Sequence, residues 1–184
     1  KKKQISSPAI LNSYPDELWE ICETELGKEK WLKEAVALNE QAGVILRVNT
    51  LKIKKSDLIK KFKEAEIEVD DLNIFENAIQ LRKRQNIFTS DLFKEGYFEV
   101  QDAGSQLIAQ FLKAEPGQKV IDACAGGGGK TLHLSALMQN KGKIIALDGE
   151  DWKLENLRKR AKRAGANNIE AQLIDATKTI EQLR

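Results

Sequence analysis

The sequence predicts an α/β protein, in which an incomplete, doubly wound parallel sheet follows N-terminal helices and a small α+β subdomain. From Lys119 onward, β-branched segments alternate with helical ones, which is typical of parallel strands joined by right-handed crossovers. Shorter strand-like segments lie between Val44 and Gln101, and apolar residues recur at helical spacing before Gly43. We therefore expect three parts: residues 1–43, 44–101 and 102–184.

The first part is expected to hold two helices after a loose arm ending near Tyr14. Pro15-Asp16-Glu17 suits a first helical turn, because proline and acidic residues are favoured there. Apolar residues continue at helical spacing on both sides of Gly27, which separates the two predicted helices.

The second part is expected to be a small α+β unit. "VILRVNT" predicts a strand over 44–50, and Ser56-Asp57 is expected to cap a helix that ends near Glu66. Two short strands are predicted from Ala78 and from Tyr97. This order fits an RNA-binding unit and a generic ferredoxin-like half-unit equally well, and the pattern does not distinguish them.

The third part is expected to begin with a helix over 103–113 that carries Leu107, Ile108, Phe111 and Leu112 on one side. Strand, glycine loop, helix, strand, helix and strand follow, then a last partial helix. Three strands make half of a doubly wound sheet, whose first strand normally lies in the middle. Since that strand would otherwise form an apolar edge, we expect the chain to be a fragment of a longer protein.

The composition favours an ordinary globular protein with two basic segments. Lys and Arg number 30 against 28 Asp and Glu. Residues 44–64 carry seven bases and two acids, and residues 151–165 carry six and two, which fits either a phosphate-binding face or a solvated helix surface. Two cysteines and one histidine are too few for a disulfide framework or a zinc site. We expect a cytoplasmic setting, no membrane span and no metal.

The glycine run in "KVIDACAGGGGKT" ends like an ATP-binding loop but has the wrong spacing. A Walker A loop needs a glycine five residues before Gly129-Lys130-Thr131, and Cys124 stands there. The pattern G-x-G-x-x-G also fails, because Thr131 or Leu132 stands where its last glycine should be. The loop does join a strand to a helix, so ligand atoms could approach the N–H groups at the start of that helix.

Each of the three predicted strands of the parallel sheet ends near an acid: Asp122, Asp148 or Asp175. Three carboxylates around a polyphosphate would repel it. A carboxylate after the second strand can accept hydrogen bonds from a ribose diol. Together they favour a ligand with hydroxyls, an adenine amino group and a positive charge, and S-adenosylmethionine has all three.

Three stretches carry a family resemblance. "DACAGGGGKT", over 122–131, resembles the cofactor loop D-x-C-A-A-P-G-G-K-T of the Nop/Sun family of RNA cytosine-5 methyltransferases, in its RsmB-like branch. "RVNTLK", over 47–52, resembles the family's R-V-N-x-x-K segment, and "VQDAGSQ", over 100–106, its V-Q-D-x-x-S-Q segment. The motifs occur in family order and extend the resemblance over roughly residues 14–184, which implies a Rossmann-like methyltransferase sheet, incomplete here.

The resemblance implies that S-adenosylmethionine is the cofactor and that RNA, ribosomal or transfer, is the partner. Asp148 would hold the ribose and Asp175 would lie by the adenine; Arg47 and Lys52 would contact RNA phosphates. Gly126 and Gly127 stand where the family has Ala and Pro, which raises the entropy cost of ordering the loop. The implied cofactor-binding residues are Cys124, Ala125, Gly126, Gly127, Gly128, Gly129, Lys130, Asp148 and Asp175.

No catalytic residue is expected in these 184 residues. The family adds a cysteine thiolate to carbon 6 of cytosine, and that cysteine and a second one belong to motifs absent here. Cys124 matches the cofactor loop instead, where a small buried cysteine is expected, and Cys22 is expected in a core. His133 is expected to face solvent or pack, and Trp152 to flank the adenine or pack.

The resemblance therefore implies an RNA cytosine-5 methyltransferase whose present segment binds the cofactor but does not transfer the methyl group. The alternative is a non-catalytic RNA-binding module on a methyltransferase-like scaffold. A nucleotide hydrolase is disfavoured by the position of Cys124. The second basic segment is expected to form a helix with Leu154, Leu157, Ala161 and Ala164 inward and most of its bases outward.

Overall fold

A computed structural model describes residues 7–73 and 76–175. The chain divides into two compact units, residues 1–42 and 43–184, which are described separately. The boundary expected near residue 101 falls inside the second unit and stays a prediction. The helix expected after Asp175 lies outside the described residues. None of the helices in the described part of the chain is both long and apolar enough to cross a membrane.

The first unit is helical and is held together by aromatic side chains. The rings of Trp19 and Trp31 lie 5.4 Å apart, and Tyr14 packs against both. Leu18 and Ile21 are exposed, so the buried face is narrower than the apolar pattern indicated. Cys22 is partly buried beside this cluster. The helices are α1 (Pro8–Leu11), α2 (Asp16–Leu26) and α3 (Lys28–Asn39).

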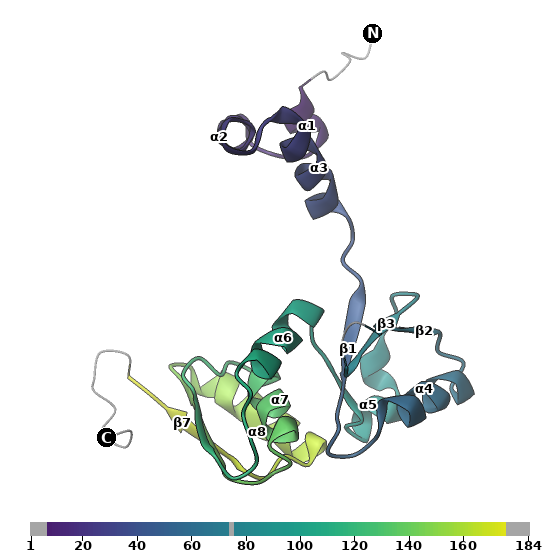
Figure 1. Cartoon of the computed structure of the whole chain (residues 1–184), viewed down its shortest axis with the longest axis vertical. Coiled ribbons are helices and arrows are strands. Elements are labelled where there is room, and N and C mark those ends of the chain that lie inside the picture. The colour runs from purple at the N-terminus through teal and green to yellow at the C-terminus, as the bar shows by residue number, and fades with distance from the viewer. Residues whose placement is uncertain (1–6, 74–75, 176–184) are drawn as a thin grey trace. The chain divides into compact units, whose positions relative to one another are not determined.

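The second unit begins with a four-stranded antiparallel sheet in the order β2-β3-β1-β4 (Figure 1). Its helices α4 and α5 pack against one hydrophobic cluster, in which Phe62 and Phe98 are fully buried. The elements are β1 (Val44–Val48), α4 (Lys55–Glu64), β2 (Val69–Asp71), β3 (Ala78–Leu81), the 3₁₀ helix η1 (Ile87–Thr89), α5 (Asp91–Lys94) and β4 (Phe98–Val100).

The two faces of this sheet differ in chemistry. Side chains alternate between faces along a strand, so Leu46 and Val48 enter the hydrophobic cluster while Arg47 points to the opposite face. Glu99 is the register partner of Arg47 on β4 and shares that face. Both residues are 2% exposed, so this charged face is buried within the second unit.

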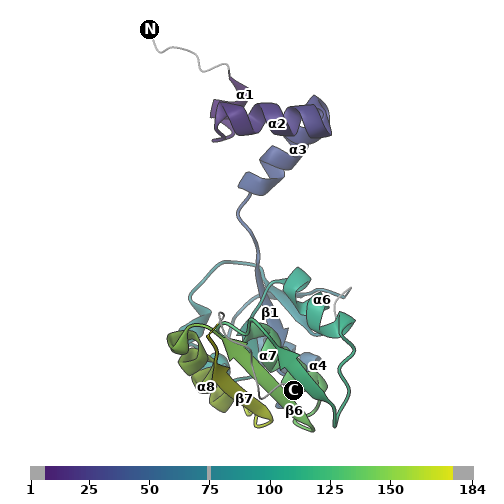
Figure 2. The same ribbon diagram turned by 90° about the vertical axis from the view of Figure 1, so that its left-hand side faces the viewer.

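The rest of the unit is a parallel sheet in the order β5-β6-β7 with its helices (Figure 2). The mixed α/β class predicted from sequence is confirmed, with antiparallel and parallel sheets in one chain. The elements are α6 (Ala103–Phe111), β5 (Lys119–Asp122), α7 (Gly129–Leu137), β6 (Lys143–Asp148), α8 (Asp151–Ala164) and β7 (Ile169–Leu173).

Several local predictions were wrong. The N-cap of α4 is Lys54, without a side-chain cap, so Ser56 and Asp57 lie inside the helix rather than capping it. Strand β2 was missed, because three residues give no periodic signal. In α6 the buried positions are Ala103, Gln106 and Ala109. The apolar residues expected to form its packing side are exposed: Leu107, Ile108, Phe111 and Leu112.

Candidate cofactor site

The glycine loop joins the end of β5 to the start of α7. The backbone turns through left-handed conformations at Gly126 (φ 53°) and Gly128 (φ 86°), which glycine adopts without steric cost. Gly128 also needs to be small, because a Cβ there would lie 2.8 Å from Cγ of Leu157 on α8. The Gly128 N–H donates to the Ala125 carbonyl at 2.9 Å and closes the turn.

Asp148, the last residue of β6, holds the loop directly. Its Oδ2 accepts the N–H of Gly126 at 2.8 Å, and its Oδ1 accepts the N–H of Glu150 at 3.0 Å. The Gly126 hydrogen bond is the largest cause that lowers the pKa of Asp148, so the carboxylate is charged at neutral pH. Each oxygen retains a lone pair, so Asp148 can accept further hydrogen bonds from a ligand.

The three strand-end acids are brought to the same edge of the sheet but have different partners. Register pairs Asp122 with Ala146 and Asp148 with Leu173, so Asp148 extends two residues beyond Asp122. Oδ2 of Asp122 accepts the hydroxyl of Thr131 at 2.7 Å and thereby fixes the first turn of α7. Asp175 is exposed and lies two residues beyond the end of β7.

Two side chains of the loop, those of Cys124 and Lys130, are accessible, whereas Ala125 is buried. Cys124 is exposed, contrary to the expectation of a small buried cysteine. Lys130 is also exposed and lines a groove with Asp122 and Ala123 beside the apolar residues of α6. The first N–H groups of α7 have no intrahelical acceptor, and they begin at this loop. The loop thus combines free donors with the Asp148 carboxylate.

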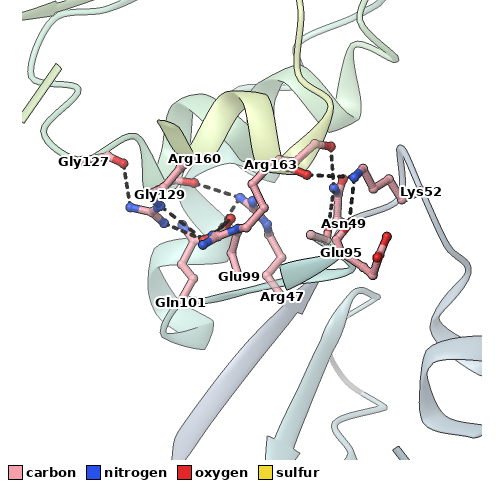
Figure 3. Close-up of polar contacts among 12 residues, drawn as sticks. Arg47, Asn49, Lys52, Glu95, Glu99, Gln101, Gly127, Gly129, Arg160 and Arg163 are labelled. Atoms are coloured by element: carbon pink, nitrogen blue, oxygen red, sulfur yellow. Dashed lines mark hydrogen bonds and ion pairs between the residues drawn. The ribbon is translucent and has the colours of Figure 1, made fainter. Parts of the chain in front are cut away.

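The "RVNTLK" stretch links the antiparallel sheet to the parallel part of the unit (Figure 3). Arg47 donates to the Gly129 carbonyl at 2.8 Å, and Asn49 donates to the Ala164 carbonyl at 2.8 Å. The Lys52 ammonium donates to the backbone carbonyls of Glu95 and Arg163, at 2.7 and 2.8 Å.

The same contacts occupy the charged groups of Arg47 and Lys52, which were expected to bind RNA phosphates. Arg47 is 2% exposed, so its guanidinium has no surface on which to meet a phosphate. Lys52 is exposed, although its ammonium is engaged with two carbonyls, and its RNA contact stays a prediction.

Burial lowers the pKa of Arg47 to about 10, and the nearby Glu99 carboxylate opposes that shift. Arg47 therefore stays protonated at neutral pH and keeps its donors for the Gly129 carbonyl.

A second set of contacts between the antiparallel sheet and α8 centres on Glu99, which belongs to none of the sequence motifs. Its Oε2 accepts Arg160 Nη2 at 2.9 Å, and its Oε1 accepts Arg163 Nη2 (Figure 3). Arg163 also stacks on the ring of Phe93, 3.7 Å from its centroid. The buried face of α8 is as predicted, but these two arginines point to Glu99 and not outward to solvent. Strict alternation in "FEV" was the only signal that set Glu99 apart from Phe98.

Of the remaining candidates, His133 is enclosed and Trp152 is exposed. His133 is 2% exposed, and its two ring nitrogens have no hydrogen-bond partner among the described residues. Burial lowers the pKa of His133 to about 3, with Arg47 adding to the effect, so the ring is neutral and cannot exchange protons with a ligand in solution. Trp152 is 60% exposed and bonds to Glu150 rather than packing in the core.

Two family models match separate segments of the chain. The ferredoxin-like domain of RsmF/B-like methyltransferases matches residues 14–88, and the 16S rRNA methyltransferase RsmB/F model matches residues 109–184. Together they cover the antiparallel sheet up to η1 and the parallel sheet with its glycine loop.

Similar proteins point the same way. The chain is 31% identical over 158 residues to a probable ribosomal RNA small subunit methyltransferase B from Synechocystis, covering 85% of this chain and 35% of that protein. It is 39% identical over 107 residues to the mouse tRNA (cytosine(72)-C(5))-methyltransferase NSUN6, covering 56% and 22%. A solved methyltransferase homologue from Pyrococcus horikoshii superposes with a TM-score of 0.81 at 28% identity, covering 90% and 54%. The chain therefore spans about a third of the length of the bacterial relative.

Proposed function

Because the chain belongs to the Nop/Sun family of methyltransferases, through its RsmB/F-like segments, we propose that it forms the cofactor-binding portion of an RNA cytosine-5 methyltransferase. The observation that carries the proposal is the Asp148–Gly126 contact. It holds a charged acceptor next to a loop of backbone donors at the carboxyl edge of a parallel sheet.

S-Adenosylmethionine fits the residues present. The ribose diol would donate to Asp148, whose oxygens each accept one backbone N–H and have capacity for one more bond. The loop from Cys124 to Lys130 would approach the methionine part with its backbone N–H groups, and Asp175 would lie by the adenine. Three acids at one edge suit a cationic ligand and disfavour a polyphosphate. When bound, the cofactor supplies an electrophilic methyl group.

RNA is the proposed substrate, because the relatives are named as ribosomal RNA and transfer RNA methyltransferases. We propose no catalytic residue within the chain. Cys22 belongs to the helical unit, and Cys124 lies in the cofactor loop, so neither matches the family's nucleophile position. The 184-residue chain by itself is expected to bind cofactor without transferring its methyl group to RNA.

Calorimetric titration with S-adenosylhomocysteine tests the binding. Asp148→Ala is expected to weaken binding by about 10-fold or more, since hydrogen bonds to a charged group are among the stronger ones. Asp151→Ala is the matched control, because Asp151 is a nearby exposed acid on the first turn of α8. A folded sample that binds no cofactor would instead support the alternative, a non-catalytic RNA-binding module.

Methyl transfer is tested separately with isotopically labelled S-adenosylmethionine and ribosomal or transfer RNA. No incorporation is expected from the 184-residue chain. Incorporation above background would contradict the assignment of the chemistry to residues outside it.

A further inference from the structure

We propose that Arg160 and Arg47 are positioning residues of the cofactor loop, each holding one loop carbonyl: Arg160 keeps the turn at Gly127 closed, and Arg47 fixes the start of α7, whose first N–H groups face the cofactor. The inference rests on the proposed function and adds to it the residues that orient the loop. Both arginines approach the loop from outside it, Arg160 from α8 and Arg47 from the antiparallel sheet (Figure 3).

Arg160 bridges the loop and a buried carboxylate. Its Nη1 donates to the Gly127 carbonyl at 2.6 Å, while its Nε and Nη2 donate to Glu99 at 3.2 and 2.9 Å. The Glu99 side chain is 3% exposed, so its position is fixed by packing. A planar guanidinium that is held on one edge by a fixed carboxylate presents its other edge in a defined direction. Arg160 therefore fixes the Gly127 carbonyl relative to Glu99 on β4.

Arg47 acts two residues further along the loop, at Gly129. A single guanidinium nitrogen donates both to Gln101 at 3.0 Å and to the Gly129 carbonyl at 2.8 Å. Gln101 is itself held, because its carbonyl accepts the side-chain amide of Gln106 at 3.0 Å. Gly129 is the first residue of α7, so Arg47 fixes the start of the helix whose free N–H groups face the proposed cofactor.

Anchoring a carbonyl also sets the direction of an N–H group. The peptide unit is planar and trans, so the C=O of one residue and the N–H of the next point in opposite directions. Holding the Gly129 carbonyl therefore aims the N–H of Lys130 away from Arg47. Holding the Gly127 carbonyl likewise supports the Gly128 N–H in its bond to Ala125.

The anchoring is of particular value in this sequence, because four consecutive glycines lose more conformational entropy on ordering than other residues do. Contacts that order the loop before the ligand arrives reduce the cost of binding. Arg160 Nη1 would lie 3.2 Å from a Cβ added at Gly127, so the guanidinium lies directly against the loop backbone.

Arg163 provides a matched control for Arg160. Both arginines come from α8, both pair with Glu99, and their side chains are similarly exposed, 27% for Arg160 and 21% for Arg163. Only Arg160 reaches the loop, whereas Arg163 stacks on Phe93. Arg160→Met and Arg163→Met thus remove the same type of ion pair, and only the first removes a loop contact.

The test measures amide hydrogen exchange by NMR in the cofactor-free full chain. The reporters are the Gly126 and Gly128 amides, which are hydrogen-bonded to Asp148 and Ala125. Arg160→Met is expected to speed their exchange by about 10-fold or more, because loss of a hydrogen bond from a charged donor opens the loop locally. Arg163→Met is expected to change these exchange rates by less than about 3-fold, although its Tm should fall by about as much as that of Arg160→Met. Arg160→Lys, which keeps one donor group, should recover part of the protection.

The same variants are titrated with S-adenosylhomocysteine. Arg160→Met is expected to weaken its affinity by about 10-fold, and Arg163→Met by less than about 3-fold. Equal exchange rates at the reporter amides in the two variants would overturn the positioning role. If Arg160→Met does not fold, Arg160→Gln takes its place, because its shorter side chain cannot bridge Glu99 and the Gly127 carbonyl, and rates equal to wild type in that variant would overturn the role. If wild type binds no S-adenosylhomocysteine, but Arg160→Met still exchanges the reporter amides faster than Arg163→Met, the proposed function is overturned and the positioning role stays intact.

Discussion

The buried ring of His133 is expected to lower the free energy of unfolding on mild acidification. The ring is buried in α7 with both nitrogens unpaired among the described residues, and its pKa is lowered from 6.5 to about 3. Protonation would place a second cation close to Arg47, which is charged and equally buried. The unfolded chain therefore binds a proton at His133 between about pH 6.5 and pH 3, while the folded chain does not.

The sign and size follow from proton linkage. Because the unfolded state holds the extra proton in this window, the free energy of unfolding falls as the pH falls. Between pH 7 and pH 5, the two pKa values give a loss of about 2 kcal/mol from this one group. The loss continues down to about pH 3, where the folded protein would also protonate His133.

Urea unfolding at pH 7, 6 and 5 measures this loss in wild type and in His133→Leu. Leucine cannot titrate, so the difference between the two pH dependences isolates His133 from the carboxylates that both proteins share. Wild type should lose about 2 kcal/mol more than the variant between pH 7 and pH 5. Equal losses, or an NMR titration of the His133 ring with a midpoint near pH 6, would refute the reasoning.

Three further changes test other parts of the second unit. Glu99→Gln leaves buried cations without their counter-charge and should cost about 3 kcal/mol in urea unfolding; a loss below about 1 kcal/mol would contradict the ion-pair account. Gly128→Ala forces alanine to a φ of 86° and brings its Cβ within 2.8 Å of Leu157, so Tm and cofactor affinity should both fall. Gly126→Ala, at a φ of 53° with no atom within 4 Å of the added Cβ, is the control that carries backbone strain without the clash and should lower Tm less. Phe62→Ala empties a fully buried position and should cost about 3–5 kcal/mol by the same measurement, whereas a cost near zero would mean that the cluster collapses to fill the cavity.

Local patterns in the sequence determined the main elements of the second unit. The inward residues of α8 follow its helical period and are the buried ones, and the second strand of the parallel sheet, expected to end near Asp148, is β6, which ends at Asp148. The glycine loop was also predicted to lie between a strand and a helix, because consecutive glycines favour a turn over regular secondary structure. Asp148 was identified as a ligand candidate from its position alone, since the carboxyl ends of parallel strands share an edge.

The tertiary structure decided which polar groups meet. Arg160 and Glu99 lie 61 residues apart in sequence, and Arg47 reaches a carbonyl 82 residues away, so no local period could reveal either contact. The same holds for α6, whose apolar side chains are exposed because its small residues pack against the rest of the unit. Periodicity reports the geometry of one element, whereas the partner of a charged side chain depends on how two elements are docked. The sequence alone therefore determined where the glycine loop lies, and only the fold decided that two distant arginines contact it.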